Sequence, residues 1–209
     1  MPQRVASILA AFFLALIIFV TSVFVSRNDR YVFGQSPTPV PSAEKEEIEV
    51  NYNMPYPGRV LSDHILWPVK ALRDKLWLLI TFDPVKKGEV NLILANKRMV
   101  SAQVLAERKK PELAVVTAEK AQKYLDGAMK AEKSARESNK NTNNLLESIG
   151  MSALKHRQIL EEMLLGVPED AKPVVILLIN NSKESFRNTQ NSLANLGRPL
   201  IDNPFEKKD

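Results

Sequence analysis

Apolar and small residues recur every three or four positions through most of the chain after residue 60, the spacing that places side chains on one face of an α-helix. Prolines that suit a first helical turn, and glycines that suit a last one, divide this pattern into elements. The division predicts a short helix over 67–81 and long helices over 84–109, 111–138, 144–165 and 168–196.

The polar segment Ser138–Asn144 leaves two interpretations open. Its sequence, SNKNTNN, lacks apolar residues, and the apolar stripe resumes at Leu145. A break here gives helices of similar length that can lie side by side, whereas one continuous helix over 111–165 would be roughly 80 Å long. We favour the break, and its position between Asn139 and Gly150 stays open.

Three of the long helices carry an inner stripe in which small residues alternate with apolar ones. Small residues allow helix backbones to approach closely, and short turns favour antiparallel neighbours. The sequence therefore predicts an all-α domain, an antiparallel helical bundle of about four long helices plus a short leading helix. The stripes are Val85, Gly88, Leu92, Ala95, Met99, Ala102 and Ala106, then Ala114, Thr117, Ala121, Tyr124, Ala128, Ala131 and Ala135, and finally Val175, Ile179, Ser182, Phe186, Thr189, Leu193 and Leu196.

The segment His64–Pro84 is predicted to open the folded domain and not to cross a membrane, because its charges leave only 76–82 as continuous apolar sequence. We expect Trp67 and Phe82 to be buried anchors at the two ends of an amphipathic helix, with Asp83 capping the next helix. The apolar stripe of this short helix is Val69, Leu72, Leu76 and Leu79 or Ile80.

The N-terminal stretch Val5–Val25 is predicted to be a transmembrane anchor. It holds 21 residues without a charge, enough to cross ~30 Å of hydrocarbon as a helix. A cleavable signal peptide is the alternative, but no small-residue cleavage pattern follows the stretch. Basic residues bias residues 1–4 slightly towards the cytoplasm. We therefore expect a single-pass protein of the cell membrane, with the bulk of the chain extracytoplasmic.

The chain between the anchor and the bundle has the composition of a linker. Residues 26–59 contain repeated prolines and an acidic run, which favour extended, solvated backbone. The sequence thus divides into a helical domain over 60–199, this preceding linker, and a flexible tail over 200–209.

Two segments carry a resemblance to a known family. They are YPGRVLSDHILWPVKALRDKLWLLITFDPVKKGEVNLILANKRM and KHRQILEEMLLGVPEDAK. Over roughly Tyr56–Asn195 the chain resembles the bacterial domain-of-unknown-function family numbered fifty-six sixty-seven, although Trp67 stands where that family usually has tyrosine and Val69 where it has leucine. The resemblance implies a helical, often membrane-tethered, exported domain, and it implies no catalytic residue or ligand.

Few residues could support catalysis or metal binding. The chain has no cysteine and seven glycines, which excludes thiolate chemistry and argues against a glycine-rich phosphate loop. The two histidines are His64, which with Asp63 suits a helix cap, and His156, which falls on an inner face. We interpret His156 as a polar, half-buried histidine, with a metal or proton-sensing role as the alternative. No triad order or paired-acid motif appears. We therefore predict no enzyme activity, no catalytic, cofactor or metal site, and no cofactor.

The charge of the chain is too weak to indicate nucleic-acid binding. The net charge is +5, and it falls to about +3 without residues 1–43. Two classes of function follow. The first is a non-catalytic envelope scaffold, held in the membrane through Val5–Val25, that binds a protein partner or itself. The alternative is a bundle that senses a ligand or ion with the His156 region.

Overall fold

The computed structural model describes residues 14, 33–34 and 48–206 of the chain. The described part contains helices and no β-strand, so it is all-α as predicted. The predicted anchor Val5–Val25 lies outside the described residues apart from Leu14. No helix of the described part combines the length and the apolar character needed to cross a bilayer. The helices are α2 (Trp67–Ile80), α3 (Pro84–Glu107), α4 (Pro111–Glu137), α5 (Asn143–Gly166) and α6 (Lys172–Asn195).

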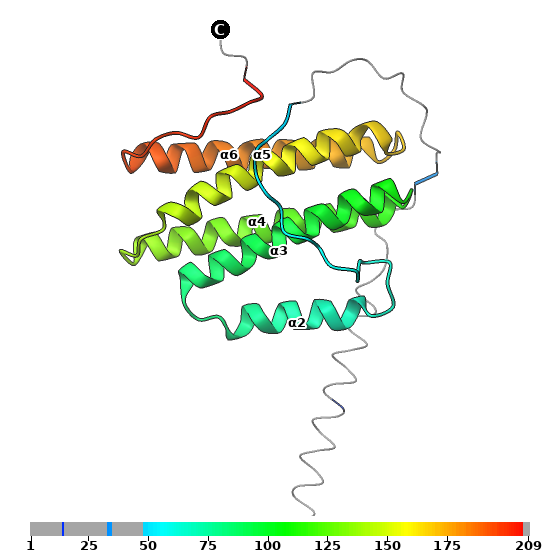
Figure 1. Ribbon diagram of the computed structural model, residues 1–209, viewed down its shortest axis with the longest axis horizontal. Coiled ribbons are helices and arrows are strands. Elements are labelled where there is room, and N and C mark those ends of the chain that lie inside the picture. Colours follow the sequence, from blue (N-terminus) through cyan, green and yellow to red (C-terminus); the bar gives the residue numbers. More distant parts are fainter. Residues whose placement is uncertain (1–13, 15–32, 35–47, 207–209) are drawn as a thin grey trace, which may run out of the picture.

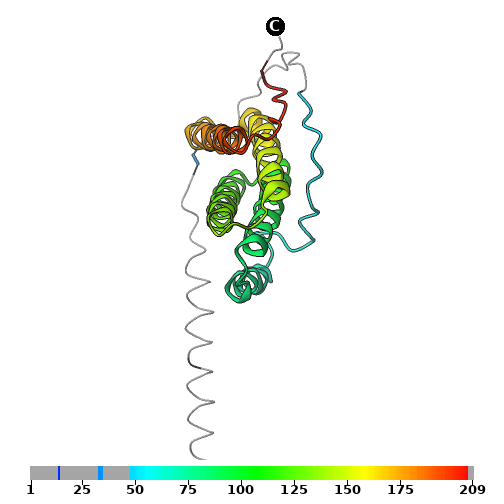
Figure 2. The ribbon, with the colours of Figure 1, turned by 90° about the vertical axis from the view of Figure 1, so that its left-hand side faces the viewer.

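The helices form a bundle built from two helical hairpins with α2 on its outer edge (Figures 1 and 2). α3 packs most extensively on α4, and α5 packs on α6. α2 contacts α3 and lies on the side of the bundle away from α6 in both views. Two clusters of buried side chains fill the interior, one around Met99, Leu105 and Leu160 and one around Leu125 and Ile149.

The predicted break between the third and fourth long helices is confirmed. α4 ends at Glu137 and α5 begins at Asn143, so one continuous helix over 111–165 is wrong. Asn139 has a φ of 55°, a left-handed conformation that asparagine tolerates and that ends α4. The hydroxyl of Thr142 donates to Glu132 at 2.7 Å, which ties the start of α5 to the last turns of α4.

The last helix begins later than predicted. Residues 168–171 form a turn in which the Ala171 N–H donates to the Pro168 carbonyl at 3.0 Å, and α6 starts at Lys172 with a proline in its first turn. The chain offers two prolines suited to a helix start, Pro168 and Pro173, and the second one is used. Val167 and Ala171 are buried beneath the turn.

The inner stripes of the long helices face the core as predicted. In α4 every alanine of the stripe is buried, and in α6 the stripe is buried as far as Leu193. Gly88 shows how close the helices lie, because a Cβ atom there would be 2.6 Å from Cδ2 of Leu145. A larger side chain at that position would push α5 away from α3.

The structure differs from the prediction at both boundaries of the folded domain, the linker before it and the tail after it. Within the predicted linker 26–59, Val50 is buried in the core and its N–H donates to the Gln158 side chain at 2.9 Å. Within the predicted tail 200–209, the backbone of Ile201 exchanges two hydrogen bonds with the Gln190 side chain. These contacts join residues distant in the chain, which local composition does not reveal.

The prediction for the short helix is half right. Trp67 is buried, but Phe82 is 89% exposed and is therefore not a core anchor. Asp83 does cap α3, since its Oδ1 accepts the Lys86 N–H at 3.0 Å, and it also pairs with Lys140. Phe82 precedes that cap, but its ring is exposed to solvent and does not form the predicted apolar contact at the start of α3.

Phenylalanine replacements test this assignment. Phe82→Ala should change the free energy of unfolding by less than about 0.5 kcal/mol, because the side chain is already exposed. Phe186→Ala should destabilise the domain by about 3–5 kcal/mol, because Phe186 is buried in the second cluster. Thermal and urea denaturation of residues 48–206 give both values. A large loss on changing Phe82 would contradict its exposed position.

Candidate functional site

A buried ion pair joins α2 to α3. Arg98 of α3 donates from Nη2 to Oδ2 of Asp74 at 2.7 Å, and the two side chains are only 2% and 1% exposed. The other Asp74 oxygen accepts from Arg73 at 2.7 Å. Both carboxylate oxygens therefore have charged partners, which is what a buried carboxylate requires.

An aromatic ring lies beside the same arginine. The guanidinium of Arg98 is 4.2 Å from the centre of the Trp67 ring, and the ammonium of Lys70 is 5.5 Å from that centre. Nε and Nη1 of Arg98 have no hydrogen-bond partner among the described residues. Stacking on the ring offsets part of this loss, because the ring face attracts cations.

Lys70 extends the contact to the chain before α2. Its Nζ donates to the carbonyls of Pro57 and Val60 at 2.6 and 2.8 Å. Burial and the neighbouring Arg98 charge lower the pKa of Lys70 to about 8. α2 is thus attached to the domain by Trp67, Lys70 and Asp74, which form one polar and aromatic contact.

A second buried polar cluster joins α3 to α5. Oδ1 of Asn96 accepts from the Ser152 hydroxyl at 2.5 Å and lies 3.1 Å from Nε2 of His156. The amide nitrogen of Asn96 donates to the Tyr52 hydroxyl at 3.0 Å. These partners assign the proton of His156 to Nε2. Nδ1 then faces an interior that offers it no partner among the described residues.

His156 is placed as predicted, on the inner face of α5, and it is completely buried. Burial lowers its pKa to about 3, so the ring is neutral at physiological pH. The described residues contain no group of three histidine, aspartate or glutamate side chains that could hold a metal ion. His156 thus has the partners of a structural histidine, and its contacts form no ligand set.

His64 and Asp63 separate instead of forming one cap. Nδ1 of His64 accepts the Leu66 N–H at 3.1 Å just before α2. Asp63 pairs with Lys110 at 2.8 Å, at the turn between α3 and α4. The hydrogen bond and charge of Lys110 lower the pKa of the Asp63 carboxyl.

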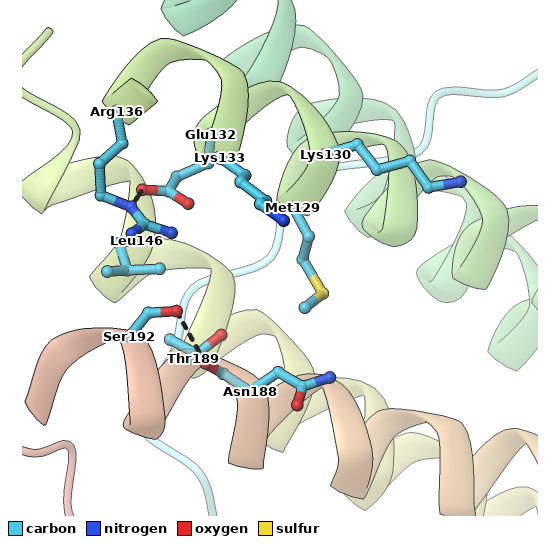
Figure 3. Close-up of a pocket in the computed structure, with 9 residues that line it drawn as sticks. All are labelled: Met129, Lys130, Glu132, Lys133, Arg136, Leu146, Asn188, Thr189 and Ser192. Atoms are coloured by element: carbon cyan, nitrogen blue, oxygen red, sulfur yellow. Dashed lines mark hydrogen bonds and ion pairs between the residues drawn. The ribbon is translucent and has the colours of Figure 1, made fainter. Parts of the chain in front are cut away.

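Figure 3 shows a hollow of about 330 Å³ between α4, α5 and α6. Met129 and Leu146 form its apolar wall. The Glu132 carboxylate at one end already pairs with Arg136 at 3.1 Å. Lys130 and Lys133 supply positive charge, but Thr189, the other buried polar group of the lining, donates its hydroxyl to the Ser185 carbonyl at 3.0 Å. The hollow therefore lacks the features of a built ligand site.

A second hollow of about 400 Å³ lies between α5, α6 and the chain near residue 203. Arg157 on its wall pairs with Glu161 at 2.8 Å and lies 3.8 Å above the Phe205 ring. Its charge is therefore engaged, and this hollow too has no catalytic arrangement among its lining residues.

These observations define a class of protein: a small helical-bundle domain whose buried polar groups connect its own helices. The chain belongs to the family described as Domain of unknown function, DUF5667, whose profile matches residues 59–170, just over half of the chain. The resemblance drawn from the sequence is therefore confirmed. The match covers α2 to α5 and ends before α6. Comparison with curated proteins and with solved structures found no match.

Sequence reasoning missed the pair of Asp74 and Arg98. In the sequence, Asp74 is one of the charges that interrupt the apolar run of residues 64–84, and Arg98 stands within the longer of the two segments that resemble the family. The available signal was the position of Asp74, which lies two residues from Leu72 and Leu76 and thus on the opposite side of the helix from the apolar stripe.

Separating the pair tests its importance. Asp74→Ala should destabilise the domain by about 3–5 kcal/mol, because it leaves Arg98 buried without a countercharge. The double variant Asp74→Leu with Arg98→Met should recover much of that loss, because it removes both charges. Urea denaturation measures each value, and Lys75→Ala, an exposed neighbour, is the control. Equal losses in the single and double variants would contradict this account.

The buried imidazole of His156 predicts a dependence of stability on pH. The unfolded chain takes up a proton as the pH falls through about 6.5, whereas the folded protein does so only near pH 3. The contribution of His156 to the free energy of unfolding is therefore complete above pH 6.5, and it is lost progressively as the pH falls towards 3. At pH 5 the loss should be about 2 kcal/mol.

The comparison uses variants that remove one titrating group each. Between pH 7 and 5 the free energy of unfolding of His156→Gln should fall by about 2 kcal/mol less than that of the wild type. His64→Gln removes an exposed histidine and should retain the wild-type slope. Urea midpoints across the pH range give the slopes, and parallel curves for His156→Gln and the wild type would refute the assignment.

Proposed function

We propose that the protein is a membrane-anchored, extracytoplasmic helical module that acts by binding and not by catalysis. The observation that carries the proposal is the uncovered surface of α2, a helix attached to the bundle by its polar side while apolar side chains face outward. The uncharged stretch Val5–Val25 supports the anchor, and the bias of basic residues supports export of the domain.

The polar groups of the interior also support a role in binding. Asp74, Arg98, Asn96 and His156 use their side chains to connect helices to one another. A catalytic centre would expose such groups in a cleft. The complete burial of His156 gives a ligand no route to its ring, so we favour a scaffold over a ligand-sensing or ion-sensing bundle.

Membrane extraction and a reporter test the anchor and its orientation. The full chain should remain in the membrane fraction after carbonate extraction, because an apolar transmembrane helix is not released by high pH. A reporter fused after Asp209 should behave as exported. Ile17→Arg, which places a charge in the middle of the stretch, should release or mislocalise the protein. A soluble product that begins near Ser26 would show a cleaved signal peptide instead.

A further inference from the structure

The outer face of α2 is an uncovered apolar stripe. Val69, Leu79 and Ile80 are 66%, 71% and 65% exposed, and Leu76 lies between them with half of its surface exposed. The stripe continues to Phe82 at the end of the helix. These are the residues that sequence periodicity places together, but they point away from the bundle.

Basic side chains border this stripe. Arg73 and Lys75 are exposed on its two sides, and Lys86 and Lys87 follow Phe82 at the start of α3. Of these four, Arg73 also pairs with Asp74 and Lys86 with Glu89. The three carboxylates between residues 64 and 89 are all engaged, because Asp74 is buried with Arg98, Asp83 caps α3 and pairs with Lys140, and Glu89 pairs with Lys86. The same segment holds five lysine and arginine side chains, so its net charge is +2.

We infer that the outer face of α2 lies in the interface of an anionic lipid bilayer. A helix with an apolar face and basic edges binds in the plane of such a surface, with its apolar side chains at the boundary of headgroups and acyl chains. Lys75 can extend to lipid phosphates while its stem covers the stripe, and Lys87 adds a second exposed cation beyond Phe82. Trp77 follows Leu76 and is 38% exposed, and an indole ring suits the same boundary.

Charge distinguishes the bilayer from a second copy of the chain. Two α2 faces packed on each other would bring the net positive charge of both segments together, because Asp74, Asp83 and Glu89 are already paired within each copy. Anionic lipid supplies the missing charge. The inference rests on the proposed anchor, which keeps the domain near the bilayer and makes contact by α2 an intramolecular step.

The chain contains no cysteine, so a probe can be attached at one chosen position. Leu76→Cys places it in the centre of the stripe and Ile80→Cys near its end. Leu177→Cys is the matched control, because Leu177 is an exposed leucine of α6, the helix on the opposite side of the bundle from α2 (Figures 1 and 2). Each variant of the full chain carries a nitroxide or a polarity-sensitive dye and is reconstituted in vesicles.

Probes at Leu76 and Ile80 should enter the lipid in vesicles that contain phosphatidylglycerol. Their accessibility to oxygen should exceed that of the probe at Leu177 by about twofold or more, and phosphatidylcholine alone or added salt should reduce the difference. Lys75→Gln with Lys87→Gln should have the same effect as salt. Probes at Leu76 and Leu177 that remain equally exposed to water would overturn the inference.

Two further readouts separate the alternatives. Spin–spin broadening at Leu76 that persists without anionic lipid would show contact between copies and would overturn the bilayer assignment. Carbonate extraction of the same vesicles reports the anchor independently. If the chain resists carbonate extraction and its probe at Leu76 is exposed to water, only the role of α2 is refuted. If the probe is immersed in lipid and carbonate releases the chain, only the anchor is refuted.

Discussion

The buried ion pair of Asp74 and Arg98 determines how α2 is rotated about its own axis. A buried charge is tolerated only while its partner remains in place, so α2 cannot turn on the bundle without leaving Arg98 buried and unpaired. Leu76 is two residues from Asp74 and therefore lies on the opposite side of the helix. A polar interaction, and not the burial of apolar surface, thus decides which side of α2 contacts the domain.

The rest of the bundle follows the usual hydrophobic rule. In α3 and α4 small residues permit close contact, and Gly88 leaves room for Leu145 of α5. Within this apolar packing, Asn96 and His156 form a polar contact whose geometry specifies one register between α3 and α5. An apolar interior tolerates small shifts between helices, whereas a buried hydrogen bond is lost when its partners move by an ångström.

Much of this architecture could be predicted from the sequence, because the information is local. Spacing of apolar residues, prolines and the polar segment near Asn139 located the helices and the break between α4 and α5. The orientation of α2 was predicted wrongly, since periodicity shows which residues share a face but not what that face contacts. Asp74 finds its partner 24 residues further along the chain, and Val50 is buried by helices much later in the sequence. Contacts of this kind depend on the complete fold.

The polar contact of α2 and the apolar packing of α3 to α6 have different roles in the domain. α3 to α6 bury their apolar stripes and supply a rigid support, so α2 does not need its own stripe for folding. Exposed apolar surface normally favours self-association, but the basic border around Arg73 and Lys75 opposes contact between like-charged copies. A helix held by its charged side can present its apolar side to another phase without losing its position on the domain. The buried ion pair is therefore the structural reason why this chain can have both a stable fold and an uncovered apolar face.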